Sequence, residues 1–375
     1  SQALEVPPDL RFFLAFNFLN SSALLADFLP ELKELLLRLG PDQVYVSIHE
    51  NGSDDGTANL LLGLVPWLKK YRVPHSVRVN QTLDYNATLT GLRTRPESVD
   101  RIQWMSMVRN AALVPLYDGS TGLWPGVDPD KLRVVFFNDV YWKVSDFLTL
   151  LHTNDQAYDI ACAMDFYTTF YDTWVTRDIQ GRVPSGVYPY LRERKSQRLL
   201  KEGKPVPVRA CWNGLVVMKA QPFLKAEPPV RFRHCGRARG QKAKEGEDPC
   251  YASECQLVCD DFRRHGYTQI FMNPQVKVTY EKSDYGWHRK WWQSWLDFAL
   301  GMLYVPLWPM FLPTVDHPGD FEECFGSQPF FVDQPWLCIV LSAASCLGLC
   351  TGAIMVPYHY RYATGCKPLN AVKIK

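Results

Sequence analysis

The first 150 residues alternate between short, almost wholly apolar runs and longer stretches in which leucine recurs at helical spacing. Residues 12–18, 44–48 and 133–137 have the pattern of buried strands. Residues 23–39 have the pattern of a helix that ends at Gly40. Strands joined by helices in this order predict an α/β fold, a mostly parallel sheet flanked by helices. With 375 residues and 47% hydrophobic content, the chain can bury such a core.

The same alternation continues along the chain and places polar loops after several strands. Because open α/β sheets bind ligands beyond the carboxyl ends of their strands, these loops predict a ligand site. We expect a donor-binding half over about residues 1–150 and an acceptor half over about 151–282. The further helices are expected at 58–71 and 101–116, and the further strands at 76–79, 159–166 and 211–219.

Composition excludes several classes of function. Forty-one basic and 39 acidic residues give a net charge of +2, so no overall field favours nucleic acid, and we expect no nucleic-acid partner. The chain has no P-loop and no GxGxxG after a strand, which argues against a kinase or a dehydrogenase.

Eleven cysteines are many for a cytosolic enzyme. Cys255 and Cys259 approach the spacing of zinc ligands, but no CxxC pair occurs, so disulfides in an oxidising lumen are the favoured interpretation. The pairing cannot be deduced from spacing. Four N-x-S/T sequons fit the same compartment. The crowded cysteines are Cys211, Cys235, Cys250, Cys255 and Cys259, and the sequons begin at Asn20, Asn51, Asn80 and Asn86.

The C-terminal part of the chain predicts association with a membrane. Residues 335–358 contain no charged side chain and are long enough to cross a bilayer, although a buried core helix would have the same composition. A basic tail, 359–375, follows and favours the cytoplasmic side. Residues 283–334 are expected to form an apolar, aromatic interfacial segment. Since the chain starts at Ser1 without a leader, we expect a signal or anchor to have been removed.

The run VVFFNDVYW, residues 134–142, ends a buried strand on Asn138 and Asp139. A carboxylate at a strand end is a suitable ligand for Mg²⁺ or Mn²⁺, which prefer oxygen ligands. Asn138 can add an amide oxygen. The alternative is a turn or a helix cap before the next helix.

Two further groups of residues suit a nucleotide diphosphate. Glu50 and Asp54 follow the second strand, where a carboxylate can accept hydrogen bonds from a ribose or a base, or form a solvated turn. Arg101 and Arg109 are eight residues apart on one expected helix and can share a face toward phosphates, or an exposed face.

Aromatic and acidic residues downstream suit a sugar, because a ring stacks on a pyranose while acids bind its hydroxyls. Glu254 is the main candidate for work at the reacting centre, with a helix-capping role as the alternative. His288 is a candidate that could approach the metal from the C-terminal side, or a structural histidine. Asp165 and Asp178 are the further catalytic candidates, and the candidates for binding the sugar or the acceptor are Asp172, Trp174, Arg177, Trp212 and Asn213.

Several motifs occur in an order that resembles the fungal capsule-associated mannosyltransferases, the cryptococcal α-1,3-mannosyltransferase family (glycosyltransferase family 69). The resemblance covers roughly residues 10–282. Its motifs are SIHENGSDDGT, RNAALVPL, FFNDVYW, AMDFYTTFYDTWVTRDIQG, CWNG, SECQLVCDDFRRHG and NPQVKVTY.

The resemblance implies a GT-A-like fold that uses GDP-mannose and a divalent cation, Mn²⁺ or Mg²⁺, and forms α-1,3 linkages with retention. It implies a nucleotide-proximal Glu50, a phosphate-facing Arg109, and the acids and aromatics from Asp165 to Glu254 around sugar and acceptor. Asp139 would take the place of the family's DxD motif, and His288 is our proposed second ligand.

We therefore expect a membrane-associated Golgi or ER mannosyltransferase, with its catalytic domain in the lumen, that takes a nucleotide sugar donor and a glycan or glycolipid acceptor. Two alternatives remain open. One is a retaining glycoside hydrolase that uses two of these carboxylates. The other is a non-catalytic glycan-binding or scaffold subunit with the same fold.

Overall fold

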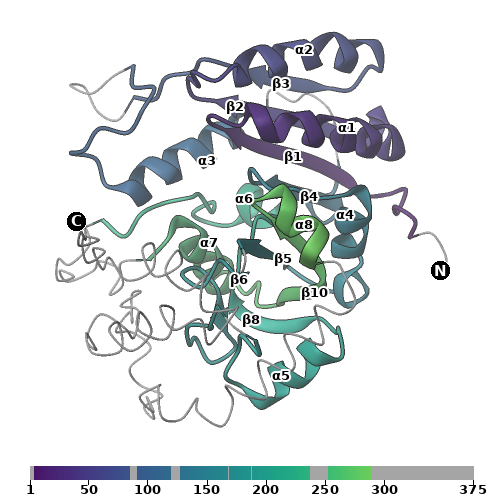
Figure 1. The fold of residues 1–375 in the computed structure, drawn as a ribbon, viewed down its shortest axis with the longest axis vertical. Coiled ribbons are helices and arrows are strands. Elements are labelled where there is room, and N and C mark those ends of the chain that lie inside the picture. Colours follow the sequence, from purple (N-terminus) through teal and green to yellow (C-terminus); the bar gives the residue numbers. More distant parts are fainter. Residues whose placement is uncertain are drawn as a thin grey trace, which may run out of the picture. The chain divides into compact units, whose positions relative to one another are not determined.

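Four parallel strands from the first 137 residues form one half of the sheet, in the order β3-β2-β1-β4. Because both faces of these strands are buried, each reads as a continuous apolar run. This half agrees with the expected parallel α/β order. The computed structural model is drawn in Figure 1. The strands are β1 (Arg11–Phe18), β2 (Val44–Glu50), β3 (His75–Arg78) and β4 (Leu132–Phe137).

The second half of the sheet is mixed, which corrects the expectation of a mostly parallel sheet. It continues in the order β9-β5-β10-β8-β7: β9 is antiparallel to both β4 and β5, β10 is parallel to β5, and β8 and β7 are antiparallel. The short β6 pairs with β5. The strands are β5 (Ile160–Tyr167), β6 (Thr169–Phe170), β7 (Arg177–Asp178), β8 (Val206–Ala210), β9 (Leu215–Lys219) and β10 (Ile270–Thr279).

Helices cover both faces of the sheet. One core joins the faces of α1, α2 and α4 to alternate residues of β1 such as Phe12 and Leu14. The other core joins α3, α6 and α7 to the intervening residues such as Phe13 and Ala15. The helices are α1 (Ser22–Leu39), α2 (Thr57–Lys70), α3 (Arg101–Tyr117), α4 (Val144–Leu151), α5 (Arg194–Lys201), α6 (Gln221–Lys225), α7 (Glu254–Arg264) and α8 (Lys282–His288).

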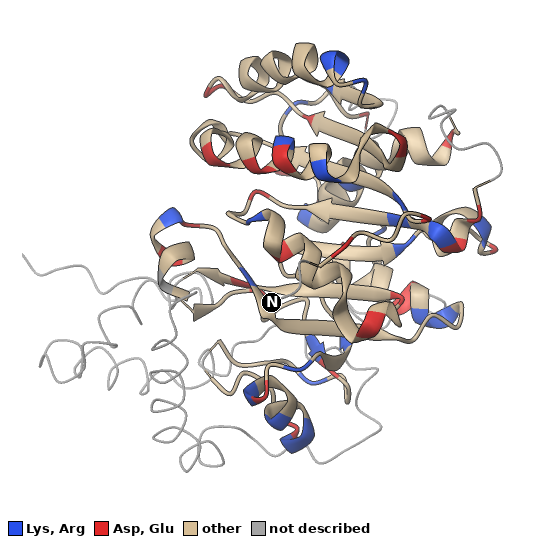
Figure 2. Ribbon diagram, turned by 90° about the vertical axis from the view of Figure 1, so that its right-hand side faces the viewer, with Lys and Arg blue, Asp and Glu red and all other residues tan. Residues whose placement is uncertain are grey.

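The sequence pattern predicted the first elements to within two residues. In α1, leucines at helical spacing face the core, and the helix ends before Gly40, whose φ of 81° suits glycine. Lys, Arg, Asp and Glu lie mainly on helices, loops and strand ends, while the strand interiors are largely free of them (Figure 2). Residues 211–214, expected as the start of a strand, instead form the turn that enters β9.

Strands from both halves of the sheet have an end at the same edge. The carboxyl ends of β1, β2 and β4 lie there because these strands are parallel. The antiparallel β9 begins at the same edge, since Leu215 pairs with Phe137. β5 and β10 end there, with Thr279 opposite Phe166. The edge therefore gathers residues from across the chain, and the predicted polar loops lie on it.

The structure describes residues 4–84, 91–119, 127–167, 169–186, 188–236 and 252–288, all within the unit Ser1–Gly301. None of the helices in these ranges is both long and apolar enough to cross a membrane. Only residues 283–288 of the expected interfacial segment are described, and they belong to α8. The expected membrane helix 335–358 and basic tail 359–375 lie outside the described residues and stay predictions.

Candidate active site

The step from Asn138 to Asp139 lies at the centre of the polar edge, directly after β4. The N–H of Asn138 donates to the carbonyl of Gly214, 2.8 Å away. Gly214 has a φ of 76°, and a Cβ there would come within 2.9 Å of Val140 Cγ1. Only glycine therefore allows the turn before β9 to approach this step so closely.

Asp139 itself is exposed, and no other described side chain hydrogen-bonds to its carboxylate. Crowding by the surrounding protein raises the pKa of Asp139, while the positive charge of Arg109 acts in the opposite direction. Its oxygens are thus open to an external partner. Their position at a strand end is the one that the sequence predicted for a metal ligand.

Arg109 and Glu254 form a buried ion pair. The Nε atom of Arg109 donates to Oε1 of Glu254 over 2.8 Å, and their side chains are only 7% and 4% exposed. Glu254 also accepts a hydrogen bond from the Ser253 hydroxyl at the start of α7. The sequence singled out both residues, but as a phosphate contact and as an acid at the reacting centre. The structure binds them to each other.

The Arg109 guanidinium also organises Asn138. Its carbon lies 4.4 Å from the ring centre of Trp212, a cation–π contact. Oδ1 of Asn138 accepts from Arg109 Nη1 at 3.3 Å and from Trp212 Nε1 at 3.0 Å. Asn138 is thereby held in one orientation, and its side-chain oxygen is already used by the protein.

Two carboxyl groups, Asp165 and Asp172, share a crowded position beside this step. Asp165 accepts from the N–H of Asp172 and from the hydroxyl of Tyr280, both at 3.1 Å. Burial and the charge of Asp172 raise the pKa of Asp165 well above its ordinary value. Burial raises the pKa of Asp172 to about 6. This pair therefore retains protons that exposed carboxyls release.

Tyr280 is a site residue that the sequence analysis did not single out. It follows β10, and it lies close enough to Asp165, Asp139 and Asp172 for their charges, after burial, to raise its pKa well above the ordinary value. Its ring lies 4.8 Å from that of Tyr171. The signal available in the sequence was its place at the end of NPQVKVTY, but only the pairing of β10 with β5 brings it to the acids.

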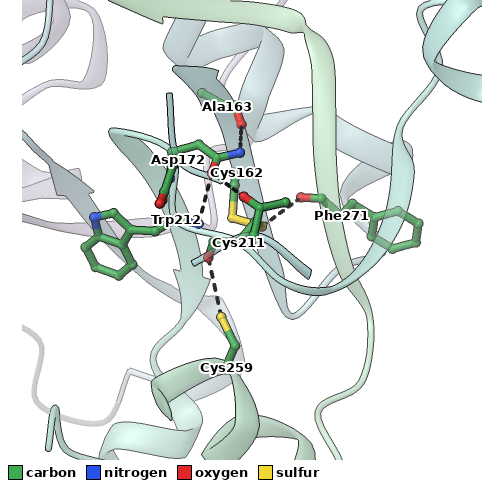
Figure 3. The surroundings of a disulfide bond; sticks show 9 residues. Cys162, Ala163, Asp172, Cys211, Trp212, Cys259 and Phe271 are labelled. Atoms are coloured by element: carbon green, nitrogen blue, oxygen red, sulfur yellow. Dashed lines mark hydrogen bonds between the residues drawn. A yellow bond between two sulfur atoms is a disulfide. The ribbon is translucent and has the colours of Figure 1, made fainter. Parts of the chain in front are cut away.

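Asn213 connects the turn before β9 to this acidic pair. Its N–H donates to Asp172 Oδ2 over 3.3 Å, and its side-chain amide donates to the carbonyl of Ala163 over 2.8 Å. Figure 3 shows this turn beside the disulfide between Cys162 and Cys211, which confirms that the chain forms a disulfide, although the sequence did not give this pairing. Cys255 and Cys259, placed among the candidate disulfide cysteines, are buried free thiols instead.

The loop after β2 is organised by Glu50. Burial opposes its charge, but hydrogen bonds from the N–H groups of Asn80, Ser53 and Gly52 outweigh that cost and lower the pKa of Glu50. Asp54 is exposed on this loop. Arg101 is exposed at the start of α3, so it does not share the buried position of Arg109 two turns further on.

The remaining candidates lie beside the acidic pair or away from it. Arg177 donates to the carbonyls of Trp174 and Thr176, and burial lowers the pKa of Arg177 to about 10 although Asp172 opposes this. Asp178 accepts from Arg182 Nε at 2.8 Å, in a turn next to β7. Its carboxylate is used within that turn.

His288 lies buried at the end of α8, with its ring stacked on Phe166 at 4.2 Å. Among the described residues no group of three or more histidine, cysteine, aspartate or glutamate side chains could hold a metal ion. The second-ligand role of His288 stays a prediction.

Comparison with known proteins shows the family of this chain. The family model described as Cryptococcal mannosyltransferase 1 matches residues 11–261. Alpha-1,3-mannosyltransferase CMT1 of Cryptococcus neoformans is 32% identical over 298 residues, which cover 72% of this chain and 58% of that protein. The chain belongs to the cryptococcal mannosyltransferase 1 family. It matches less than two thirds of this relative's length.

Two solved structures show weaker similarity. The mannosyltransferase PcManGT from Pyrobaculum calidifontis, in complex with GDP-Man and Mn²⁺, is 12% identical, with a TM-score of 0.41 over 98% of this chain and 84% of that chain. S. aureus TarS 1-349 is 12% identical, with a TM-score of 0.35 over 72% and 60%.

Proposed function

We propose that this chain transfers mannose from GDP-mannose to a glycan or glycolipid acceptor and forms an α-1,3 linkage with retention. The observation that carries the proposal is Asp139, an exposed carboxylate just after β4 that has no side-chain partner among the described residues. Arg109, Trp212 and Gly214 hold the residue before it in place. Membership of a mannosyltransferase family supports the sugar, and the curated relative supports the linkage.

A divalent cation fits this position with one protein carboxylate. Asp139 offers free oxygens, while Asn138 Oδ1 is occupied by Arg109 and Trp212. Donor diphosphate and water would therefore complete the ligand set, because Mg²⁺ and Mn²⁺ retain waters and phosphate oxygens readily. When bound, the cation neutralises charge on the leaving diphosphate.

The protein's own groups have separate roles in this proposal. Glu50 accepts three hydrogen bonds from the loop after β2 and one from Asn80 after β3, so that the loop's exposed Asp54 and backbone can contact the nucleoside. Glu254 neutralises Arg109 and thereby fixes Asn138. Asp165, Asp172 and Trp212 border the position expected for the sugar.

A lumenal location in the Golgi or ER is part of the same proposal. The disulfide between Cys162 and Cys211 supports an oxidising compartment, since cytosolic thiols are kept reduced. Asp178 and Arg177 are both engaged by nearby backbone or side chains. We therefore propose that they act on the acceptor side indirectly, by holding neighbouring residues in place.

Release of GDP from GDP-mannose, with and without Mn²⁺ and acceptor oligosaccharide, tests the proposal. We expect cation-dependent transfer that EDTA abolishes and Mn²⁺ restores. A glycoside hydrolase would cleave an aryl mannoside without GDP or metal, and a non-catalytic subunit would bind glycan without turnover. Either of these results would overturn the proposal.

A further inference from the structure

Helix α3 is tied to the sheet by side chains from three neighbouring strands. Asn17 on β1 donates to the carbonyl of Val108 at 2.9 Å, and Ser47 on β2 donates to the carbonyl of Ala112 at 2.6 Å. Arg78 on β3 donates through Nη2 to the carbonyl of Ala111. Helices normally pack on sheets through apolar contacts alone. Three hydrogen bonds in addition fix both the rotation of α3 about its axis and its position along that axis.

The bond from Arg78 meets a specific need of the helix. In an α-helix the carbonyl of Ala111 would accept from the N–H of residue 115, but that residue is Pro115 and has no N–H. The proline ring also crowds this carbonyl and turns it away from the helix axis. Arg78 supplies the donor that Pro115 cannot give to the carbonyl of Ala111.

His49 lies between Asn17 and Arg78 and is compatible with the buried charge of Arg78. His49 is the register partner of both Asn17 and Arg78, so the three side chains lie in a row on the α3 face of the sheet. Burial, then the charge of Arg78, lowers the pKa of His49 to about 4. His49 is therefore neutral at physiological pH and does not repel Arg78.

The next residue after Val108 is Arg109, which reaches Glu254 and Asn138 from the same turn of α3. A rotation of the helix by one residue would turn Arg109 by about 100° away from both. We propose that Arg78, with Asn17 and Ser47, is a positioning residue for Arg109. Pro115 leaves the carbonyl of Ala111 free to accept the hydrogen bond from Arg78. The kinetic part of this inference rests on the proposed transferase function.

A double-mutant cycle on stability tests the contact without any substrate. Arg78→Met removes the donor, and Pro115→Ala restores a backbone N–H for Ala111. We expect Arg78→Met to lower Tm by about 4 °C, and by clearly less when Pro115→Ala is present. Arg38→Met, an exposed arginine on α1, is the matched control and should change Tm little. An equal loss of Tm in both backgrounds would overturn the inference.

Kinetics at a temperature well below Tm tests the positioning role. We expect Arg78→Met to lower kcat/KM for GDP-mannose roughly tenfold, Arg78→Lys to restore part of it, and Pro115→Ala to restore part of it in the double variant. Unchanged kinetics in Arg78→Met, despite a coupled loss of Tm, would leave the contact but reject its role in positioning Arg109. A wild-type chain without turnover would instead reject the proposed function, and the Tm cycle would still decide the contact.

Discussion

Nε of Arg109 lies 2.8 Å from Oε1 of Glu254, although 145 residues separate the two in the chain. The pair joins α3 to the first residue of α7 and buries both charges beside Trp212. A buried pair of this kind gives little net stability, but removing one partner leaves the other charge uncompensated. Its main effect here is to fix the position of Asn138 next to Asp139.

We expect Arg109→Met to destabilise the fold by about 3 kcal/mol, because Glu254 would remain buried and unpaired. The double variant Arg109→Met/Glu254→Gln should recover a large part of that loss. Urea unfolding of the wild type, both single variants and the double variant measures the coupling. Additive losses would show that the two charges do not depend on each other.

Asp139→Asn should abolish cation-dependent binding of GDP and reduce turnover by at least about a hundredfold, since it removes the exposed carboxylate that follows β4. Tm should stay close to the wild-type value, because the Asp139 carboxylate is exposed and hydrogen-bonds to no other side chain in the part of the chain that the structure describes. Titration calorimetry with GDP and Mn²⁺ measures the binding. Glu34→Gln, at an exposed position on α1, is the control and should behave like the wild type.

Gly214→Ala should impair both folding and activity. The new Cβ would come within 2.9 Å of Val140 Cγ1 and 3.1 Å of Val278 Cγ2, and φ is 76°. We expect a loss of about 2 kcal/mol in the free energy of unfolding and weaker GDP binding, because the Asn138–Asp139 step must move. Gly63→Ala is the control, since its Cβ would meet nothing within 4 Å. Equal effects at the two positions would contradict the prediction.

The acidic pair predicts a specific dependence of stability on pH. The folded-state pKa of Asp165 is raised well above 3.8 and that of Asp172 to about 6, so the folded chain binds protons that the unfolded chain has released. The pair's contribution to the free energy of unfolding therefore falls as pH rises above about 4. Asp165→Asn resembles the protonated acid, and we expect a flatter Tm profile between about pH 4 and 6. A profile as steep as that of the wild type would refute this assignment.

The disulfide should matter for the site as well as for stability. Its loop spans 49 residues, so loss of the bond is expected to cost about 4 kcal/mol from chain entropy. The double variant Cys162→Ala/Cys211→Ala should also lose turnover, because Cys211 directly precedes Trp212 and Asn213. Denaturant unfolding and GDP-mannose turnover measure the two effects. Dithiothreitol should lower the stability and the turnover of the wild type and leave those of the double variant unaffected.

The strands and helices of the first 150 residues could be predicted because their buried residues recur at the local spacing of a helix or form a short apolar run. Leucine spacing defined α1, and apolar runs defined β1, β2 and β4. The direction of β9 and β10 could not be predicted in the same way, since a run of apolar residues has the same pattern in a parallel and an antiparallel strand. The turn at 211–214 was for that reason expected as part of a strand.

For the site, the amino-acid sequence alone determined the family, the strand that ends on Asn138 and Asp139, and the set of acids and aromatic residues to consider. Tertiary structure alone decided which of them act on each other: Arg109 with Glu254, Asp165 with Tyr280, and Arg78 with the carbonyl that Pro115 leaves without a donor. The physical reason is that residue type sets what a side chain can bond to. Strand order and register set which partner comes within about 3 Å, and those depend on contacts between distant segments.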